Sequence, residues 1–181
     1  MSLFNTPTKF GLISLFLHWL MAFLLYGLFF LGYWMVDLGY YHDWYEKAPF
    51  LHISFGFIIL ILLFFRLAWR FFNPPPVPLK NYLLATTMYY LLYFCIFLLC
   101  LSGYLLASVT GELMTFFNLF EIMPFEFENP LWLADNQEEI MTIIHQYGAY
   151  LLIILSLLHA TAAFIHAFIY KDKTLTRIFG L

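Results

Sequence analysis

Four long apolar segments constrain the fold of this chain more than any other feature of its sequence. They span about residues 10–35, 50–69, 82–108 and 140–170, and each reaches the roughly 20 residues that a membrane-spanning helix needs. Only 10% of the residues are charged, against about 25% in a typical soluble domain. The sequence therefore predicts an all-α integral membrane protein, with residues 1–181 forming a single four-helix transmembrane bundle.

Basic residues are distributed unevenly among the connections between these segments. If the four helices alternate in direction, seven of the eight Lys and Arg residues share a side with both termini, and that side carries one acid, for a net charge of +6. The opposite side carries ten acids and Lys47, for a net charge of −9. Because Lys and Arg favour the cytoplasmic side of a membrane, we expect both termini to be cytoplasmic. That side is called the inner side below.

The outer segment 109–139 interleaves aromatic and acidic residues. This pattern suits a chain that lies along the membrane interface with its rings at the depth of the lipid headgroups. A lid over an outer site is the alternative interpretation.

Four histidines lie inside the predicted spans, where titratable side chains are costly. His145 and His159 share the fourth span and are 14 residues apart, which places them within about 40° of one helix face and roughly 21 Å apart in height. His18 and His159 lie toward the inner halves of their helices, whereas His52 and His145 lie near the outer ends. The depths therefore predict an inner pair, His18 with His159, and an outer pair, His52 with His145.

Two pairs of histidines at two depths suit two haems better than a zinc site, which needs three or four clustered ligands. For any one histidine, an interhelical hydrogen bond is the competing explanation. No C-x-x-C-H motif is present, so the haems would be non-covalent haem b groups, each with two histidine ligands to its iron. With both axial positions filled, such irons transfer electrons and do not activate oxygen directly.

Several further side chains are candidates for contact with these haems. Gly56, one turn after His52, and Gly103 in the third span would allow a porphyrin to approach closely, although ordinary helix packing explains both equally well. Arg66 lies near the face of His52 at the inner end of the second span, where it could bind a haem propionate, and Arg70 follows one turn later. Snorkelling toward lipid headgroups is the alternative for both arginines.

The combined motifs resemble those of the bacterial cytochrome b561 family. They are HW at 18–19, H-x3-G-x9-R-x3-R from His52 to Arg70, and H-x13-H-x6-H from His145 to His166, followed by KD-x-T. The resemblance covers nearly the whole chain, least in the outer segment 109–139. It implies a diheme b-type cytochrome of the bacterial inner membrane that exchanges electrons with ubiquinone. In the best-understood branch, superoxide is oxidised to oxygen at the outer side.

Two stretches depart from the family pattern. The third span begins ATTMYY, with Thr86 and Tyr89 where members of the family have histidines. The loop before His52 offers only Lys47 and His42 to attract an anion, where family members place several arginines. A net charge of −9 on the outer side repels superoxide over about a Debye length, which weighs against that substrate.

The leading functional hypothesis is a quinone oxidoreductase that moves single electrons from an outer small-molecule donor, plausibly superoxide, through the two haems to ubiquinone. His166 is the candidate catalytic residue at the quinone. It lies seven residues beyond His159, within about 20° of the same face and roughly 10 Å closer to the inner surface. A histidine bonded to lipid headgroups is the alternative for His166. Asp172 could replenish the proton of His166, although a solvated pair with Lys171 is the simpler role for it.

Two other functions stay open at this point. The chain could be the haem-bearing membrane anchor of a larger dehydrogenase or hydrogenase, with a protein partner docked on its acidic outer face. Alternatively, it could be a transporter whose histidines relay protons. Lipid is an expected partner in every case, and no basic surface for nucleic acid is present.

Overall fold

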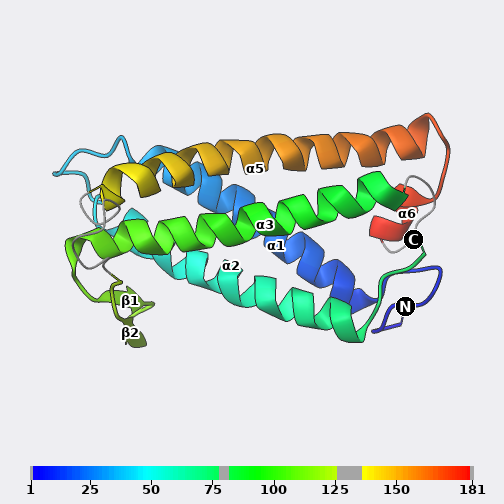
Figure 1. Cartoon of the computed structure of the whole chain (residues 1–181), viewed down its shortest axis with the longest axis horizontal. Helices are drawn as coiled ribbons and strands as arrows, with labels where there is room; N and C mark the ends of the chain where they lie inside the picture. Colours follow the sequence, from blue (N-terminus) through cyan, green and yellow to red (C-terminus); the bar gives the residue numbers. More distant parts are fainter. Residues whose placement is uncertain (1, 78–81, 126–135, 180–181) are drawn as a thin grey trace.

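Four long helices run antiparallel to one another in the computed structural model, which describes residues 2–77, 82–125 and 136–179. They are α1 (Leu12–Met35), α2 (Lys47–Phe72), α3 (Tyr82–Ala107) and α5 (Gln137–Phe168) (Figure 1). All four are long and apolar enough to cross a membrane. The predicted four-helix membrane fold is therefore confirmed.

The helix boundaries differ from the predicted ones by at most three residues, and two of the differences have local reasons. Helix α2 begins at Lys47 rather than at residue 50, because Pro49 is tolerated in a first turn. Helix α5 begins at Gln137 rather than at residue 140, and Glu138 and Glu139 in its first turn complement the helix dipole.

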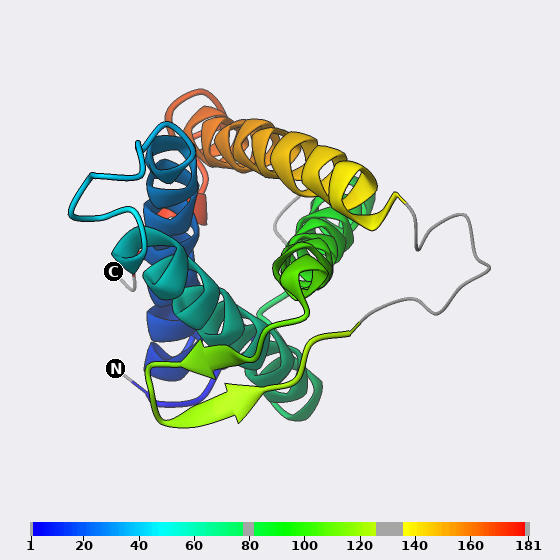
Figure 2. The same ribbon diagram turned by 90° about the vertical axis from the view of Figure 1, so that its left-hand side faces the viewer.

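Viewed from the outer end, the helices form a ring in which α1, α2, α3 and α5 follow one another (Figure 2). The contact between α3 and α5 is the most extensive, followed by that between α1 and α2. One cluster of buried side chains from all four helices packs at the middle of the bundle: Met21, Ile59, Leu63, Cys95, Ile96, Leu152 and Leu155. On α5, this layer lies between His145 and His159, so a packed apolar core separates the two predicted depths.

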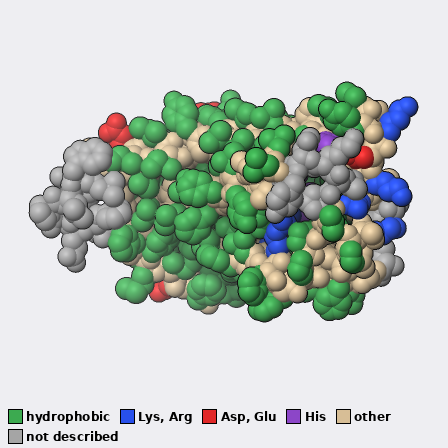
Figure 3. Space-filling view, turned by 45° about the vertical axis from the view of Figure 1, so that its right-hand side comes forward, with side chains coloured by type: hydrophobic (Ala, Val, Ile, Leu, Met, Phe, Trp, Pro, Cys, Tyr) green, Lys and Arg blue, Asp and Glu red, His purple; other side chains and the backbone are tan. Residues whose placement is uncertain are grey.

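The outer surface of the ring is apolar, as expected of helices that face lipid. Exposed side chains include Phe16 and Phe23 on α1 and Phe94 on α3. In the space-filling view, apolar side chains cover the middle of the molecule and Lys and Arg gather at one end (Figure 3). Figure 1 places both termini at that same end.

The outer connection between α3 and α5 contains more structure than the interfacial segment that we predicted for 109–139. A short helix, η1 (Ser108–Thr110), is followed by an antiparallel hairpin of β1 (Met114–Phe116) and β2 (Phe120–Ile122). The hairpin is held by Ser54 of α2, whose hydroxyl oxygen accepts a hydrogen bond from the Phe117 N–H at 3.2 Å. Residues 126–135 of the predicted segment lie outside the described residues.

At the inner end, both tails of the chain pack against α1 and α2. Trp69 stacks on Phe4, and Asn5 hydrogen-bonds the backbone of Asn73. The short helix α6 (Thr174–Ile178) follows α5. The indole N–H of Trp19 donates to the Ile178 carbonyl at 3.3 Å, which docks α6 beside α1.

Candidate functional site

The structure brings together the two histidines predicted to form the inner pair. The ring centroids of His18 on α1 and His159 on α5 are 6.5 Å apart, and the ring planes are inclined by 70°. These helices are adjacent in the ring but barely pack against each other. The two imidazoles thus face one another between neighbouring helices.

The outer pair has nearly the same geometry. The ring centroids of His52 on α2 and His145 on α5 are 6.0 Å apart, with an interplanar angle of 72°. Metal–imidazole bonds are about 2 Å long, so two imidazoles on opposite sides of one metal ion have ring centres roughly 6 Å apart. Each pair is thus spaced so that both rings could bind one metal ion between them.

Hydrogen bonds fix the tautomer of His145. Its Nδ1 lies 3.1 Å from the Leu99 carbonyl oxygen and 3.3 Å from the Ser102 hydroxyl. A carbonyl oxygen only accepts, so Nδ1 carries the proton and Nε2 keeps a free lone pair. Helix α3 contains no histidine, yet it orients this one. In the sequence, this orienting role of α3 is indicated by the polar Ser102, which stands next to Gly103 within an apolar span.

Two glycines lie against the outer pair: Gly103, which the sequence singles out together with Gly56, and Gly32, which it does not. A Cβ at Gly32 would lie 2.9 Å from Cε1 of His52, and a Cβ at Gly103 would lie 2.8 Å from Cε1 of His145. A Cβ at Gly56 would meet no heavy atom within 4 Å, so packing among the described residues does not require glycine there. Close contact with a porphyrin remains a prediction for Gly56.

His52 and His18, one imidazole from each pair, have different surroundings from His145. The Nδ1 of His52 is buried and has no hydrogen-bond partner among the described residues. The Nδ1 of His18 lies 3.2 Å from a guanidinium nitrogen of Arg66. Because a guanidinium only donates, His18 accepts at Nδ1, and its own proton lies on Nε2. Arg66 would have to release His18 before Nε2 could bind a metal ion.

Both arginines of α2 turn toward their neighbouring helices and do not snorkel outward. Arg66 is half-buried, with its guanidinium 5.6 Å from the ring centre of Tyr93. Arg70 stacks over the ring of Tyr89 at 3.7 Å, a cation–π contact between α2 and α3. The structure thus shows that Arg70 packs on the ring of Tyr89.

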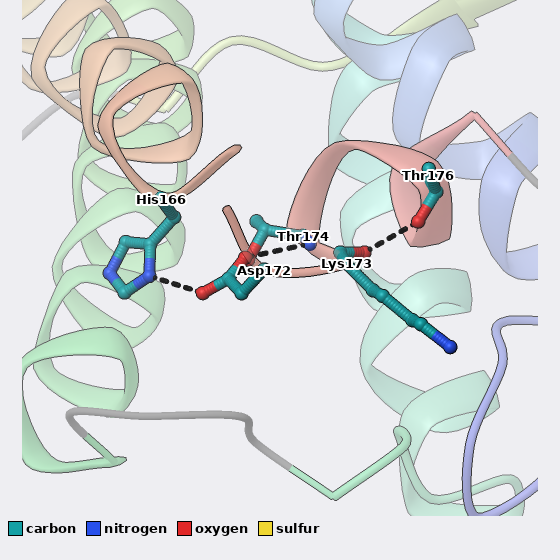
Figure 4. Close-up of polar contacts among 5 residues, drawn as sticks. All are labelled: His166, Asp172, Lys173, Thr174 and Thr176. Carbon is teal, nitrogen blue, oxygen red and sulfur yellow. Dashed lines mark hydrogen bonds and ion pairs between the residues drawn. The ribbon is translucent and has the colours of Figure 1, made fainter. Parts of the chain in front are cut away.

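His166 is hydrogen-bonded to the carboxylate of Asp172, which lies beyond the end of α5, and the two form an ion pair when the imidazole is protonated. The distance from Nδ1 to the carboxylate Oδ2 is 2.7 Å, and both side chains are largely buried (Figure 4). The predicted solvated pair of Asp172 with Lys171 is therefore wrong. The backbone of Lys171 has a positive φ of 52°, which turns the chain and brings Asp172 back to His166.

The described residues contain no cluster of three or more histidine, cysteine or acidic side chains that could hold a metal ion. Two-coordinate sites formed by imidazoles alone are typical of haem iron, whose porphyrin supplies the other ligands. Among the alternatives considered, the geometry favours haem over a zinc centre.

Comparison with known proteins agrees with a membrane protein that binds haem. A family model described as prokaryotic cytochrome b561 matches residues 9–181. The chain is 40% identical over 187 residues to cytochrome b561 homolog 2 of Escherichia coli (strain K12), an alignment that covers 99% of this chain and 96% of the relative. It is 30% identical over 132 residues to cytochrome b561 homolog 1 of the same organism, covering 70% of this chain and 72% of that relative. The chain therefore belongs to the prokaryotic cytochrome b561 family of membrane proteins, which bind b-type haem and transfer electrons.

Proposed function

We propose that this protein binds two haems b, one between His18 and His159 and one between His52 and His145, and passes electrons between them across the membrane. The observation that carries this proposal is the repeated pairing of imidazoles at two depths, with ring separations of 6.5 and 6.0 Å. The pairs are separated along α5 by 14 residues, or roughly 21 Å.

The surroundings of each pair support haem binding. Gly32 and Gly103 leave room beside the outer imidazoles, and the bond from His145 to Leu99 presents Nε2 as a ligand. Arg66 and Arg70 offer two cations near the inner pair that could bind the propionates of a haem. No acidic side chain forms an ion pair with either arginine among the residues that the structure describes. When bound, haem would accept and release one electron reversibly at its iron.

In this proposal, electrons flow from the outer side of the membrane to the inner side. The end that holds both termini is basic, so we place it in the cytoplasm, with the chain in the bacterial inner membrane. A small donor, plausibly superoxide, would deliver electrons at the outer pair. Ubiquinone would accept them near the inner pair, where His166 lies in the last turn of α5.

The outer surface weighs against rapid capture of superoxide. The first turn of α5 exposes Glu138 and Glu139, and the loop residue His42 packs against Trp34 and accepts a hydrogen bond from the Trp44 N–H. An acidic approach path slows the association of an anion, and added salt screens this repulsion. We therefore expect superoxide oxidation by this protein to speed up as ionic strength rises.

The same acidic surface favours a second candidate, a membrane anchor that receives electrons from a protein docked at the outer side. Purification separates the two functions. A haem-loaded chain that oxidises superoxide alone supports the first, whereas a partner that must co-purify for activity supports the second.

A spectroscopic experiment tests the haem assignment directly. The purified protein should show a Soret band and two redox centres, and the haem content should be two per chain. Alanine at His52 or His145 should remove one centre, and alanine at His18 or His159 should remove the other. If His18→Ala and His145→Ala abolish the same centre, the pairing is wrong. A colourless protein after expression with ample haem would refute the proposal entirely and favour the histidine-relay transporter.

A further inference from the structure

We propose that Asp172 is a positioning residue for quinone reduction, whose carboxylate holds the imidazole of His166 so that its Nε2 faces the substrate as a proton donor. This inference rests on the proposed function, because it assumes that a quinone is reduced near the inner end of α5. It adds a role for the Asp172 carboxylate, which orients His166 for proton donation to the quinone.

The chain reverses at the end of α5 in a way that delivers the carboxylate to the imidazole. Helix α5 ends at Phe168, and Lys171 then adopts a left-handed backbone conformation with φ of 52°. The backbone N–H of Asp172 donates to the His166 carbonyl at 3.1 Å. A main-chain bond and the side-chain ion pair therefore join the same two residues.

Both oxygens of the Asp172 carboxylate are engaged, so its direction is fixed. Oδ2 lies 2.7 Å from Nδ1 of His166, and Oδ1 accepts hydrogen bonds from the Thr174 N–H at 2.9 Å and the Thr174 hydroxyl at 2.5 Å. The side chains of His166 and Asp172 are only 20% and 14% exposed. Bonds that are shielded from water in this way hold the ring in one orientation.

The ion pair also sets which nitrogen of His166 can react. An ionised carboxylate only accepts hydrogen bonds, so Nδ1 carries a proton and Nε2 is the nitrogen available to a substrate. Figure 4 shows the second ring nitrogen on the edge directed away from Asp172. A carboxylate in this position orients the imidazole and stabilises its protonated form.

Hydrogen bonds keep the Asp172 carboxyl ionised. Burial opposes ionisation of this carboxyl, but hydrogen bonds from Thr174 and His166 outweigh burial and lower its pKa below the ordinary value. The neighbouring titratable and charged groups are the ring of Tyr170, which lies 5.2 Å from the His166 ring, and the cations of Lys171, Lys173 and Arg177. Arg177 donates to the Val77 carbonyl and does not compete for Asp172.

The chemistry needs such a group because quinone reduction consumes protons. One quinone takes up two electrons and two protons to give one quinol. In the proposed reaction, two superoxide ions supply the two electrons and become two oxygen molecules. His166 would pass one proton from Nε2 to a quinone oxygen and regain it from water at the inner surface, while Asp172 holds the ring in place. The second proton would come from water at the same surface by the same route, which completes the two protons of the quinol.

The test uses the intact haem-loaded protein, reduced with dithionite and mixed with a short-chain soluble ubiquinone in a stopped-flow instrument. Reoxidation of the Soret band reports the quinone half-reaction without the outer donor. Asp172→Asn keeps the shape and can still accept the hydrogen bond of the Thr174 N–H, but it removes the charge. We expect it to slow reoxidation about tenfold or more at saturating quinone and to alter the pH profile. Asp172→Glu should recover part of the rate.

Lys173→Gln is the matched control, because it changes a neighbouring charge without touching the pair. Lys173 is exposed, and its side chain extends away from His166 (Figure 4). We expect this variant to retain the wild-type rate and pH profile. A ¹⁵N histidine spectrum, assigned by comparison with His166→Gln, should show the proton on Nδ1 of His166 in the wild type and a shifted signal in Asp172→Asn.

The outcomes distinguish this inference from the function on which it rests. If quinone does not reoxidise the wild-type protein, the proposed function fails and this inference fails with it. If His166→Gln is slow while Asp172→Asn keeps the wild-type rate and pH profile, Asp172 has no such role and the proposed function stands. If His166→Gln is as fast as the wild type, neither residue serves the quinone.

Discussion

Gly32 of α1 lies directly against the imidazole of His52 on α2, so closely that a methyl group at position 32 would be 2.9 Å from Cε1 and 3.4 Å from Nδ1. Gly103 of α3 has the same relationship to His145, at 2.8 Å from Cε1. Real Cβ atoms do not approach ring atoms this closely, so either the ring or the helix would have to move. The outer pair therefore depends on small residues in two other helices.

Gly32→Ala should displace His52 and disrupt the outer redox centre while leaving the inner one intact. The expected result is loss or broadening of one of the two midpoint potentials in a redox titration followed at the Soret band. Gly27→Ala is the matched control on the same helix, because a Cβ there meets no heavy atom within 4 Å. If both variants titrate like the wild type, the packing at position 32 does not position a ligand.

Ser102→Ala should raise the potential of the outer centre. This hydroxyl lies 3.3 Å from Nδ1 of His145, and its loss leaves the Leu99 carbonyl as that atom's remaining partner among the described residues. A weaker bond at Nδ1 makes the imidazole less basic, and a less basic ligand stabilises oxidised iron less. Redox titration against Ser156→Ala, whose hydroxyl instead contacts Tyr26, would check this. An unchanged or lower potential would contradict it.

Arg66→Leu should weaken haem binding at the inner pair. In our proposal, its guanidinium leaves His18, which it contacts at 3.2 Å, and pairs with a propionate of the inner haem. Loss of that contact should lower haem affinity roughly tenfold or more, because hydrogen bonds to charged groups contribute about 1.5–3 kcal/mol. The measurement is haem retained per chain after purification, compared with Lys9→Gln, which removes an exposed charge from the same end of the molecule. Full haem content in Arg66→Leu would show that the arginine does not bind the haem.

Ser54→Ala should loosen the outer hairpin without affecting either pair of histidines. Ser54 is fully buried, and its substitution deprives the Phe117 N–H of its acceptor. An unsatisfied buried donor costs about 1–3 kcal/mol, which corresponds to faster hydrogen exchange by roughly tenfold or more. Exchange mass spectrometry over residues 114–122 would detect the change, with Thr176→Ala at the opposite end as control. Unaltered exchange would mean that other contacts hold the hairpin.

Asp172→Asn should also change how stability depends on pH. The native carboxyl has a pKa below its ordinary value of 3.8, so its stabilising effect is fully present above pH 3.8 and is lost as the pH falls through the native value. Thermal unfolding in detergent should therefore find the variant less stable than the wild type near neutral pH. The two should converge in acid. A gap that persists below the native pKa would point to a cause other than this charge.

The helices and the depths of the histidines were predictable because both follow from local rules. Long apolar runs identify the spans, and counting residues from each span's end gives the level of each imidazole. These rules apply to each helix separately and do not depend on which helices pack against each other. The four-helix fold and the family are accordingly confirmed, whereas the assignment of haem ligands stays a prediction.

The features that escaped prediction depend on contacts between distant residues. The hairpin turn places Phe117 and Asn118 at positive φ without glycine, and its anchor Ser54 lies 63 residues away from Phe117. Gly56 attracted attention because it is near His52 in sequence, yet Gly32 of another helix is the glycine that touches that ring. Asp172 pairs with His166 because of the unusual backbone of Lys171, which no hydropathy pattern encodes.

The described part of the connection between α2 and α3 fastens both tails of the chain. The N–H of Val77 donates to the Pro7 carbonyl at 3.1 Å, and the Val77 carbonyl accepts from Arg177 at 2.8 Å. The backbone of Val77 thus links the N-terminal and C-terminal tails through hydrogen bonds. Displacement of Val77 would weaken the attachment of both tails at once and leave them held by contacts such as the Phe4–Trp69 stack and the Trp19–Ile178 hydrogen bond. Fusion partners at either terminus should therefore be joined through linkers long enough not to pull on Val77.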